Sequence, residues 1–455
     1  PHTEGTVYMT VARHKMGDYA AYVYRSTDLG QTWTRIDQGV PENDFCRVIR
    51  EDPKRQGLLY LGTERGIFVS MDGGVNWQSL QCNLPVSPVY DFVVKDHDLV
   101  VATHGRSFWI LDDLTQLHQI FDELGDADRH LFRPRDTVRT PPDLFGGFWG
   151  SPGGKNYHAT IGYNATYYVD ELETGHKPTR MIDAGDDLER GVRITYLLPD
   201  EVSDTVRLTI TDTDGNEVDS FTSEIPEEKK DRDGLYAPAQ PGMNAFQWPM
   251  TAAAGVKMQD TEFHGRPDGP LVPPGTYQVT LSMGDWSQSQ TFDLVRDPRV
   301  ETSDADFAEQ YELMLKIRDK LSEVATGVNK VRTLRKQVGD WKERLADDDA
   351  ATDVLVAADD LSDRLTEVEH QLVQVEFTSE GDSLNYREML FEKLGNLAPI
   401  VRSADTRPTV QSHQVYDKLA GQIDEQLARL DELLGDPLDD LNRRLDELDV
   451  AVLGT

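Results

Sequence analysis

The stretch YRSTDLGQTW, Tyr24 to Trp33, is repeated as VSMDGGVNW, Val69 to Trp77, and both fit Ser-x-Asp-x-Gly-x-(Thr/Asn)-Trp. The two aspartates, Asp28 and Asp72, are 44 positions apart. The aspartate of such a turn can accept hydrogen bonds from later backbone N–H groups, and the glycine supplies a positive φ. The tryptophan can bury its ring under the next strand. Nothing at this spacing forms a nucleophile–base pair, so we predict structural turns.

Residues 1–130 alternate short β-rich runs with Gly, Asp and Asn turns. Repeats of about 40 residues with four short strands are the signature of propeller blades. A third, partial copy follows, in which Leu99–Thr103 aligns with Leu59–Thr63, but it lacks the Gly-x-x-Trp ending. We therefore predict the last blades of a β-propeller over 1–130. The residues given structural roles in its turns are Asp28, Gly30, Trp33, Asp72, Gly74 and Trp77.

Residues 131–298 begin with FRPRDTVRTPPDLFGGFWGSPGG, whose Pro and Gly content predicts a linker. The strand patterns that follow, from HATIGYNATYYV to SQTFDLVRD, favour an immunoglobulin-like β-sandwich. Within them, DTDGNEV at 212–218 is typical of a tight hairpin turn. A calcium loop is the alternative, but Ser223 stands at the twelfth position, where that loop needs an acidic ligand.

Residues 299–455 change to helical spacing, with apolar residues three or four apart from Phe307 to Val324. Thr302 or Ser303 can cap the first helix. Further helices are predicted at 351–375, 383–401, 410–434 and 437–452. Gly395 marks a weak point in the second of these. Together they predict an antiparallel helical bundle, with its acidic residues on solvated outer faces rather than in a partner-binding stripe.

The chain of 455 residues carries a net charge of −35, and its acidic residues are spread throughout. Such a surface argues against binding nucleic acid or anionic membranes, because phosphate neutralisation needs clustered Lys and Arg. No apolar run approaches the roughly 20 residues of a membrane helix. A halophilic source is one explanation, because salt screens self-repulsion, and solubility alone is the other. Stability that failed to rise from low to molar salt would exclude the halophilic explanation.

The two cysteines, Cys46 and Cys82, lie among apolar residues in DFCRVI and SLQCNLP. We favour small buried hydrophobes for both, and a single disulfide bridge is the alternative. Neither has a nearby His or Cys at metal spacing. The sequence predicts no metal site and no cofactor.

The repeated turns are similar to the Asp-box, or BNR, repeats of sialidases, other glycosyl hydrolases and sortilin-type propellers. The run from Asp52 to Leu117, the later PPGTYQVTL and GMNAFQWPM, and the closing PLDDLNRRLDELDVAVL also resemble large bacterial secreted BNR-repeat proteins. In that family the tryptophan of the GMNAFQW run is followed by Asp. Here Pro249 and Met250 follow it, a difference expected to affect only local packing.

This resemblance implies that the chain is the C-terminal part of a longer polypeptide, with Pro1 at the edge of a fragment. It also implies an N-terminal propeller portion of the same protein as a partner. The expected location is extracellular or periplasmic, and we expect a halophilic bacterium as the source.

The richest polar cluster is THGRSFWILDD, which brings His104, Arg106, Trp109 and Asp112, followed by Asp113, into one strand-turn-strand unit. An arginine beside a tryptophan can bind a carboxylate or a sugar face, because the guanidinium forks onto oxygens and the ring packs on C–H groups. The alternative is structural: the polar groups satisfy backbone carbonyls at the end of a blade and the tryptophan packs inside.

Two functions remain open. The first is a secreted, sortilin-like protein that binds glycan or polypeptide ligands, because no catalytic set is found. The second is a sialidase-like glycoside hydrolase whose catalytic carboxylates lie mostly outside this chain; such enzymes need two carboxyl groups across a cleft. A purely structural C-terminal region is the third interpretation. No Gly-rich phosphate loop, Gly-x-Ser-x-Gly elbow or HExxH motif is present.

The structural interpretation of the repeated turn predicts the effect of Asp72→Ala. The variant loses the hydrogen bonds accepted by the carboxylate, so its unfolding free energy should fall by about 1–2 kcal/mol. Chemical denaturation measures this change. A variant that unfolds at the same denaturant concentration as the parent would contradict the structural role.

Overall fold

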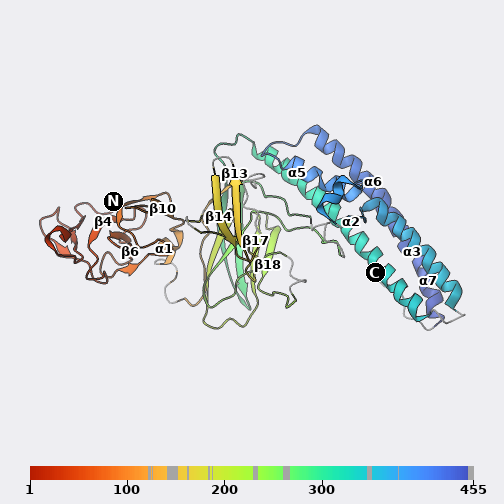
Figure 1. The fold of residues 1–455 in the computed structure, drawn as a ribbon, viewed down its shortest axis with the longest axis horizontal. Coiled ribbons are helices and arrows are strands. Elements are labelled where there is room, and N and C mark those ends of the chain that lie inside the picture. Colours follow the sequence, from red (N-terminus) through yellow and green to blue (C-terminus); the bar gives the residue numbers. More distant parts are fainter. Residues whose placement is uncertain are drawn as a thin grey trace.

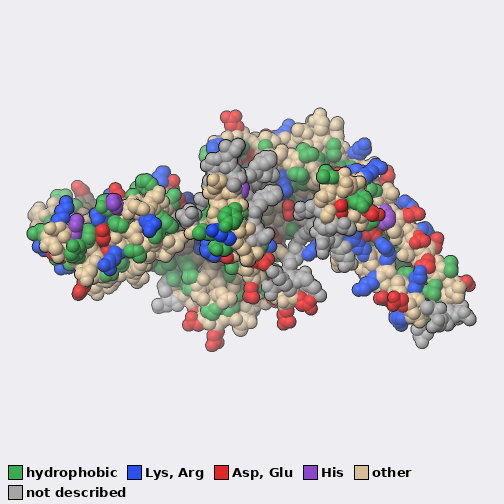
Figure 2. Space-filling model, viewed as in Figure 1, with side chains coloured by type: hydrophobic (Ala, Val, Ile, Leu, Met, Phe, Trp, Pro, Cys, Tyr) green, Lys and Arg blue, Asp and Glu red, His purple; other side chains and the backbone are tan. Residues whose placement is uncertain are grey.

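The computed structural model describes residues 1–120, 124, 127–140, 152–160, 163–182, 185–186, 188–228, 234–259, 267–345, 351–377 and 379–448. Three regions follow one another along the long axis of the molecule: small sheets, larger sheets and helices (Figure 1). Asp and Glu side chains are visible on all three regions in Figure 2. Within the described part of the chain, no helix combines the length and the apolar character that crossing a membrane requires.

The first region consists of three small antiparallel sheets, which we call blades 1, 2 and 3. Blade 1 contains β1 (Val7–Thr10), β2 (Val23–Ser26) and β3 (Thr34–Arg35); blade 2 contains β4 (Cys46–Glu51), β5 (Leu59–Thr63), β6 (Ile67–Ser70) and β7 (Gln78–Ser79); blade 3 contains β8 (Val89–Lys95), β9 (Asp98–Thr103) and β10 (Phe108–Leu111). In each blade, strands adjacent in sequence pair with each other. This meander is typical of propeller blades, as the repeated turns predicted. Blade 2 has the four strands expected of a blade, whereas three strands are described in each of blades 1 and 3.

Trp77 holds blade 2 against blade 1. Its side chain is only 4% exposed, and its Nε1 donates a hydrogen bond to the Ile36 carbonyl at 2.5 Å. Its backbone N–H donates to the Gln38 carbonyl at 3.0 Å. Gly39, with φ +99°, passes so close that a Cβ there would lie 2.5 Å from the Trp77 carbonyl oxygen. The predicted burial of the turn tryptophan is therefore confirmed for Trp77.

Trp33 holds the same position in the turn of blade 1 but is 38% exposed. Its Nε1 donates to the Gly30 carbonyl of its own turn at 3.0 Å. The prediction that the Trp33 ring is buried is wrong, because the ring packs against its own turn and not against a neighbouring blade. Burial of Trp77 depends on blade 1 beside it, and no described blade lies beside Trp33 in the same way.

The second region packs two sheets around one hydrophobic core. One sheet contains β11 (His130–Leu131), β16 (Val192–Leu198) and β19 (Gly242–Trp248); the other contains β12 (Thr137–Arg139), β17 (Val206–Thr211), β18 (Glu217–Thr222), β20 (Gly275–Met283) and β21 (Trp286–Arg296). Alternate residues of these strands point inward and form one cluster. Trp248 is fully buried in it, with Tyr277 and Phe292 at ring-centroid distances of 5.8 and 6.0 Å.

Part of the stretch predicted as a linker is a strand. Thr137–Arg139 pairs in parallel with β21. The linker prediction is wrong for these residues because a Thr-Val-Arg run suits the free edge of a sheet, whatever the Pro and Gly content around it. Residues 141–151 of that stretch lie outside the described residues. A further sheet contains β13 (Lys155–Thr160), β14 (Tyr163–Val169) and β15 (Thr179–Met181).

The turn predicted in DTDGNEV joins β17 to β18. The Asp212 Oδ1 accepts from the Asn216 backbone N–H at 2.9 Å, and Oδ2 accepts from the Asn216 Nδ2 at 2.9 Å. Gly215 has φ +83°. The Asp212 carboxylate is thus engaged by its own turn, which confirms the hairpin.

The third region contains α2 (Asp304–Arg344), α3 (Thr352–Leu372), α4 (Leu390–Gly395), α5 (Leu397–Val401), α6 (Val410–Leu434) and α7 (Asp436–Asp446). The helices α2, α3 and α6 lie alongside one another and share a core (Figure 1). Ser303 caps α2, as predicted, by accepting a hydrogen bond from the Asp306 N–H at 3.2 Å. The buried Glu369 of α3 forms ion pairs with Arg332 and Arg335 of α2, each at 2.7 Å.

A single helix over 383–401 is not formed. A 3₁₀ turn covers Glu380–Leu384, and α4 and α5 follow, separated at Asn396. Pro399 explains the break, because in a continuous helix its ring would clash with the carbonyl of residue 395. In the first turn of α5 the proline needs no N–H partner. The weak point predicted at Gly395 is where α4 ends.

The cysteines differ from each other. Both thiols are free. Cys46 is buried, and burial raises the pKa of its thiol to about 12. Cys82 is exposed, so its predicted burial is wrong. It lies in a turn with φ +42°, which turns it away from the apolar residues beside it in sequence.

Ion pairs hold α1 (Thr115–Gln119) to the blades and join neighbouring regions. Arg135, between β11 and β12, pairs with Asp98 of blade 3 at 2.5 Å. The helix α1 follows blade 3, and its His118 Nε2 lies 2.9 Å from the fully buried Asp52 of blade 2. Burial would raise the pKa of Asp52, but hydrogen bonds from His118 and the backbone outweigh it and lower the pKa. The buried Arg139 of β12 pairs with Asp405, which precedes α6, at 2.7 Å.

The two tryptophans give a matched pair of variants. Trp77→Ala should lower the unfolding free energy of the blades by about 3–5 kcal/mol, because it opens a cavity between two blades. Trp33→Ala should cost less than about 1 kcal/mol, because the ring is exposed. Urea denaturation followed by circular dichroism measures both. Equal losses would contradict the account of Trp77 as the contact that joins blades 1 and 2.

Candidate functional site

The repeated aspartates are occupied by their own turns. Asp28 Oδ1 accepts from the Thr32 N–H at 2.9 Å, and Oδ2 accepts from the Thr32 hydroxyl at 2.6 Å. Asp72 receives the same two bonds from Asn76, at 2.9 and 2.7 Å. The bonds from Thr32 lower the pKa of Asp28 to about 2. A carboxylate held ionised in this way is poorly suited to act as a general acid.

The candidate site lies at one end of the blades, which we call the loop end. Here the strands β1, β5 and β9 finish, at Thr10, Thr63 and Thr103. We call these three the second strands, because β1 takes in blade 1 the place that β5, the second of four strands, has in blade 2. The first strands of blades 2 and 3 begin at the same end. The strands are antiparallel, so Cys46 pairs with Thr63 and Val89 with Thr103. The loops that follow the second strands are therefore brought to the same end as the segments that precede β4 and β8.

A stack of rings and one guanidinium crosses the loop end. The His14 ring stacks on Phe45 with centroids 4.4 Å apart. The Arg47 guanidinium lies 5.0 Å from the Phe45 ring and 4.1 Å from the Tyr90 ring. Tyr90 in turn stacks on His104 at 5.0 Å. All three blades contribute to this stack, which is about as wide as the three packed sheets.

Two features of the stack indicate that it can bind a ligand. The Tyr90 ring is half exposed although both neighbours in the stack touch it. The Nδ1 of His14 is buried and has no hydrogen-bond partner among the described residues. Arg47 is fixed in place by a two-nitrogen contact with Glu64. The position of Arg47 in the stack is thus set by Glu64, and the buried His14 Nδ1 lacks a partner among the described residues.

A cleft of about 660 Å³ adjoins this stack on blade 1. Its walls are the segments 17–22 and 37–43 together with Arg35. Tyr22 forms part of its floor: the hydroxyl donates to Asp18 at 2.9 Å, and the Arg35 guanidinium lies 4.7 Å from the ring. Tyr19 stands at the edge, 52% exposed, with its ring 6.3 Å from that of Phe45.

The lining of the cleft is mainly polar. Its side chains include the acceptors and amides Asp37, Gln38, Glu42 and Asn43. Of the acidic groups, Asp18 has its pKa lowered, first by the Tyr22 hydroxyl and then by the Ala20 N–H. Polar groups beside an exposed aromatic ring are suited to a sugar, whose hydroxyls need partners and whose C–H face packs on a ring.

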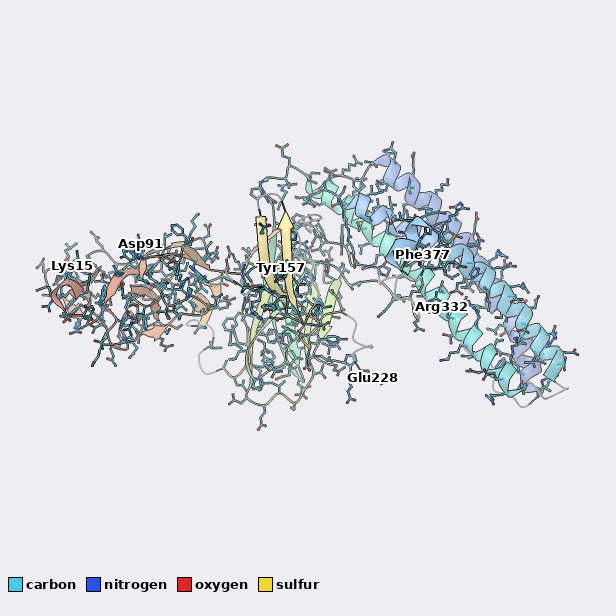
Figure 3. All side chains as sticks on the ribbon, in the orientation of Figure 1. Lys15, Asp91, Tyr157, Glu228, Arg332 and Phe377 are labelled. Carbon is cyan, nitrogen blue, oxygen red and sulfur yellow. The ribbon has the colours of Figure 1, made fainter. Side chains whose placement is uncertain are left out.

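Exposed cations occupy the loops after the second strands. Lys15 lies in blade 1, Arg65 in blade 2 and Arg106 in blade 3, all with exposed side chains. Within the described ranges, none of the three forms an ion pair. Figure 3 labels Lys15 at the outer end of the blades.

The structure separates the residues of the predicted THGRSFWILDD cluster. His104 and Arg106 lie at the loop end, the Trp109 ring reaches back to it, and Asp112 does not lie there. The strand β10 (108–111) stands between Arg106 and Asp112, which puts the two about 20 Å apart at roughly 3.3 Å per residue. Trp109 is half-buried, and its Nε1 donates to the Arg106 carbonyl at 2.9 Å. Burial and the charge of Asp98 raise the pKa of Asp112.

The stack itself was missed from sequence. Phe45, Arg47 and Tyr90 had no place in any predicted site, and only His104 did. A signal was present, because these residues stand at the starts of first strands in successive repeats. Their side chains meet only when the blades are packed, which the order of residues does not express.

No metal centre is indicated in the described ranges, since no three His, Cys, Asp or Glu side chains converge on a point there. The cleft contains carboxylates, but they are already engaged. Asp37 accepts a hydrogen bond from the Arg35 Nε at 2.7 Å, and Asp18 accepts one from the Tyr22 hydroxyl. The arrangement can bind and orient polar groups. Glycoside hydrolysis requires one carboxyl group whose pKa is raised. Burial raises the pKa of Asp44, which lies between Asn43 of the cleft and Phe45 of the stack. Its side chain is only 2% exposed and accepts hydrogen bonds from the Thr63 hydroxyl and the Arg65 N–H, so it is not presented to the cleft.

Comparisons with known proteins give no family. Neither a family model nor a curated protein sequence matches the chain. Among solved structures, an ancestral GH74 enzyme aligns over 66% of this chain and 61% of its own, with 12% identity and a TM-score of 0.20. YCF48 bound to D1 peptide aligns over 61% of this chain and 73% of its own, with 13% identity and a TM-score of 0.17. Similarity at this level carries no argument about activity or ligand, so the BNR and sortilin-like assignment stays a resemblance.

Proposed function

We propose that this chain is part of a ligand-binding propeller protein, and that the loop end of its blades binds a glycan without cleaving it. The observation that carries the proposal is the polar cleft of about 660 Å³ with the exposed Tyr19 at its edge. Sugars are bound by this combination of hydrogen-bonding groups and an aromatic face.

The second and third regions have an accessory role in this proposal. We infer that residues 131–298 form an immunoglobulin-like sandwich and residues 299–455 an antiparallel bundle, which orient the blades rather than bind the ligand. The Arg135–Asp98 pair joins the second region to blade 3, and the buried Arg139–Asp405 pair joins the second region to the third. Three blades do not close a ring, since propellers have at least four. We therefore propose further blades, from an N-terminal portion of the same secreted protein, as the partner of these three.

Glycoside hydrolysis is the alternative function. It would require an acid–base pair of carboxyl groups, one of them protonated near neutral pH. In the cleft, the pKa of Asp18 is lowered by its hydrogen bonds, whereas a general acid needs a raised pKa. Binding is therefore favoured over catalysis for the residues present.

Glycan binding is tested with galactan and galacturonan oligomers by isothermal titration calorimetry. Tyr19→Ala should weaken the affinity about tenfold, the equivalent of about 1.4 kcal/mol, because the sugar loses its aromatic face. The control is Tyr157→Ala, which removes another exposed tyrosine, from β13 of the second region, away from Lys15 (Figure 3). The control variant should bind like the parent.

Two results would overturn the proposal. If neither oligomer binds while a polypeptide such as poly-glutamate does, the ligand class is wrong. If fluorogenic glycosides are hydrolysed and Asp37→Asn or Glu42→Gln abolishes the turnover, the site is catalytic.

A further inference from the structure

The loops that follow the second strands carry a repeated positive charge in a protein with a net charge of −35. Lys15, Arg65 and Arg106 take corresponding places after the strands that end at Thr10 and Thr63 in blades 1 and 2 and at Thr103 in blade 3. Each side chain is exposed, and none has an ion-pair partner among the described residues. We call these three residues the cationic row.

We propose that the cationic row selects an acidic polysaccharide, with a carboxylate on its sugar units, as the ligand of the loop end. This inference rests on the proposed glycan binding and names its substrate class. Packed sheets lie about 10 Å apart, and we expect a similar spacing for the three loops that carry the row. A small anion meets one of them, whereas a chain with regularly repeated charge meets all three.

The chemistry of the neighbouring cleft separates a polysaccharide from an acidic polypeptide. The cleft offers the oxygen acceptors Asp37, Gln38 and Glu42, which need hydrogen-bond donors from the ligand. A peptide offers these acceptors only its backbone N–H donors, because ionised Asp and Glu side chains have none, whereas each unit of a sugar chain offers several hydroxyl donors. A uronic acid unit carries both hydroxyl donors for the cleft and a carboxylate for the row.

The two arginines are suited to this ligand for a further reason. A guanidinium can bind a carboxylate with two parallel hydrogen bonds, which fixes orientation as well as charge. Such short-range contacts persist at high ionic strength better than long-range attraction, because the Debye length is only about 3 Å at 1 M salt. The selection therefore does not depend on the overall field of the protein, which is negative.

The test compares galacturonan and galactan oligomers of equal length, the first charged and the second neutral. The triple variant K15Q/R65Q/R106Q should lose at least tenfold in affinity for galacturonan and little for galactan. The matched control K257Q/K336Q/K418Q removes the same charge from exposed lysines outside the blades and should bind both oligomers like the parent. The conservative variant R65K/R106K should retain part of the galacturonan affinity. Melting curves show whether each variant is folded.

The outcomes distinguish the two proposals. Equal binding of both oligomers, unaffected by the triple variant, would overturn the cationic row and leave glycan binding standing. Binding of neither oligomer would overturn glycan binding itself. Binding of poly-glutamate in preference to galacturonan, lost in the triple variant, would assign the row to an acidic polypeptide and overturn the polysaccharide.

Discussion

The contact on which the blade region depends is the insertion of Trp77 under the edge of blade 1. The turn around Asp72 makes it possible, because the carboxylate engages Asn76 and holds the chain in one conformation just before the tryptophan. Gly74 allows the close approach, since a Cβ there would lie 2.6 Å from Ile36. The aspartate thus acts at a distance from the loop end. It holds the turn that places Trp77 against blade 1, and the His14–Phe45 stack joins the same two blades at the loop end.

The same carboxylate geometry recurs outside the blades. Asp212 binds the backbone and side chain of Asn216, four residues on, as Asp72 binds Asn76. This turn therefore closes hairpins both inside and outside the blades. The Asp box differs from an ordinary hairpin by the tryptophan that follows the turn. This supports treating the box as a structural feature, because the part it shares with an ordinary hairpin is the part that involves the aspartate.

Sequence predicted the elements well wherever local chemistry decides. The strands of blades 2 and 3, the hairpin at 212–216 and the cap at Ser303 all depend on residues within a few positions of each other. It failed where a distant part of the chain decides. Trp33 and Trp77 share one motif but differ in burial, since only Trp77 has a described blade beside it. Cys82 resembles Cys46 in its sequence neighbours, yet a positive φ leaves it exposed. The loop-end stack belongs to the same class, because it needs three sheets in register.

The position of the polar groups also explains why an abundance of carboxylates does not make this chain an enzyme by itself. Several acidic side chains of the blades have an identified donor: Thr32 for Asp28, Tyr22 for Asp18 and His118 for Asp52. Donors to the charged form keep a carboxylate ionised. The cations of the row differ from these carboxylates, because they are exposed and have no ion-pair partners in the described ranges. In a molecule this acidic, unpaired cations gathered at the loop end are the groups with capacity left for a ligand, and the ligand they can accept is negatively charged.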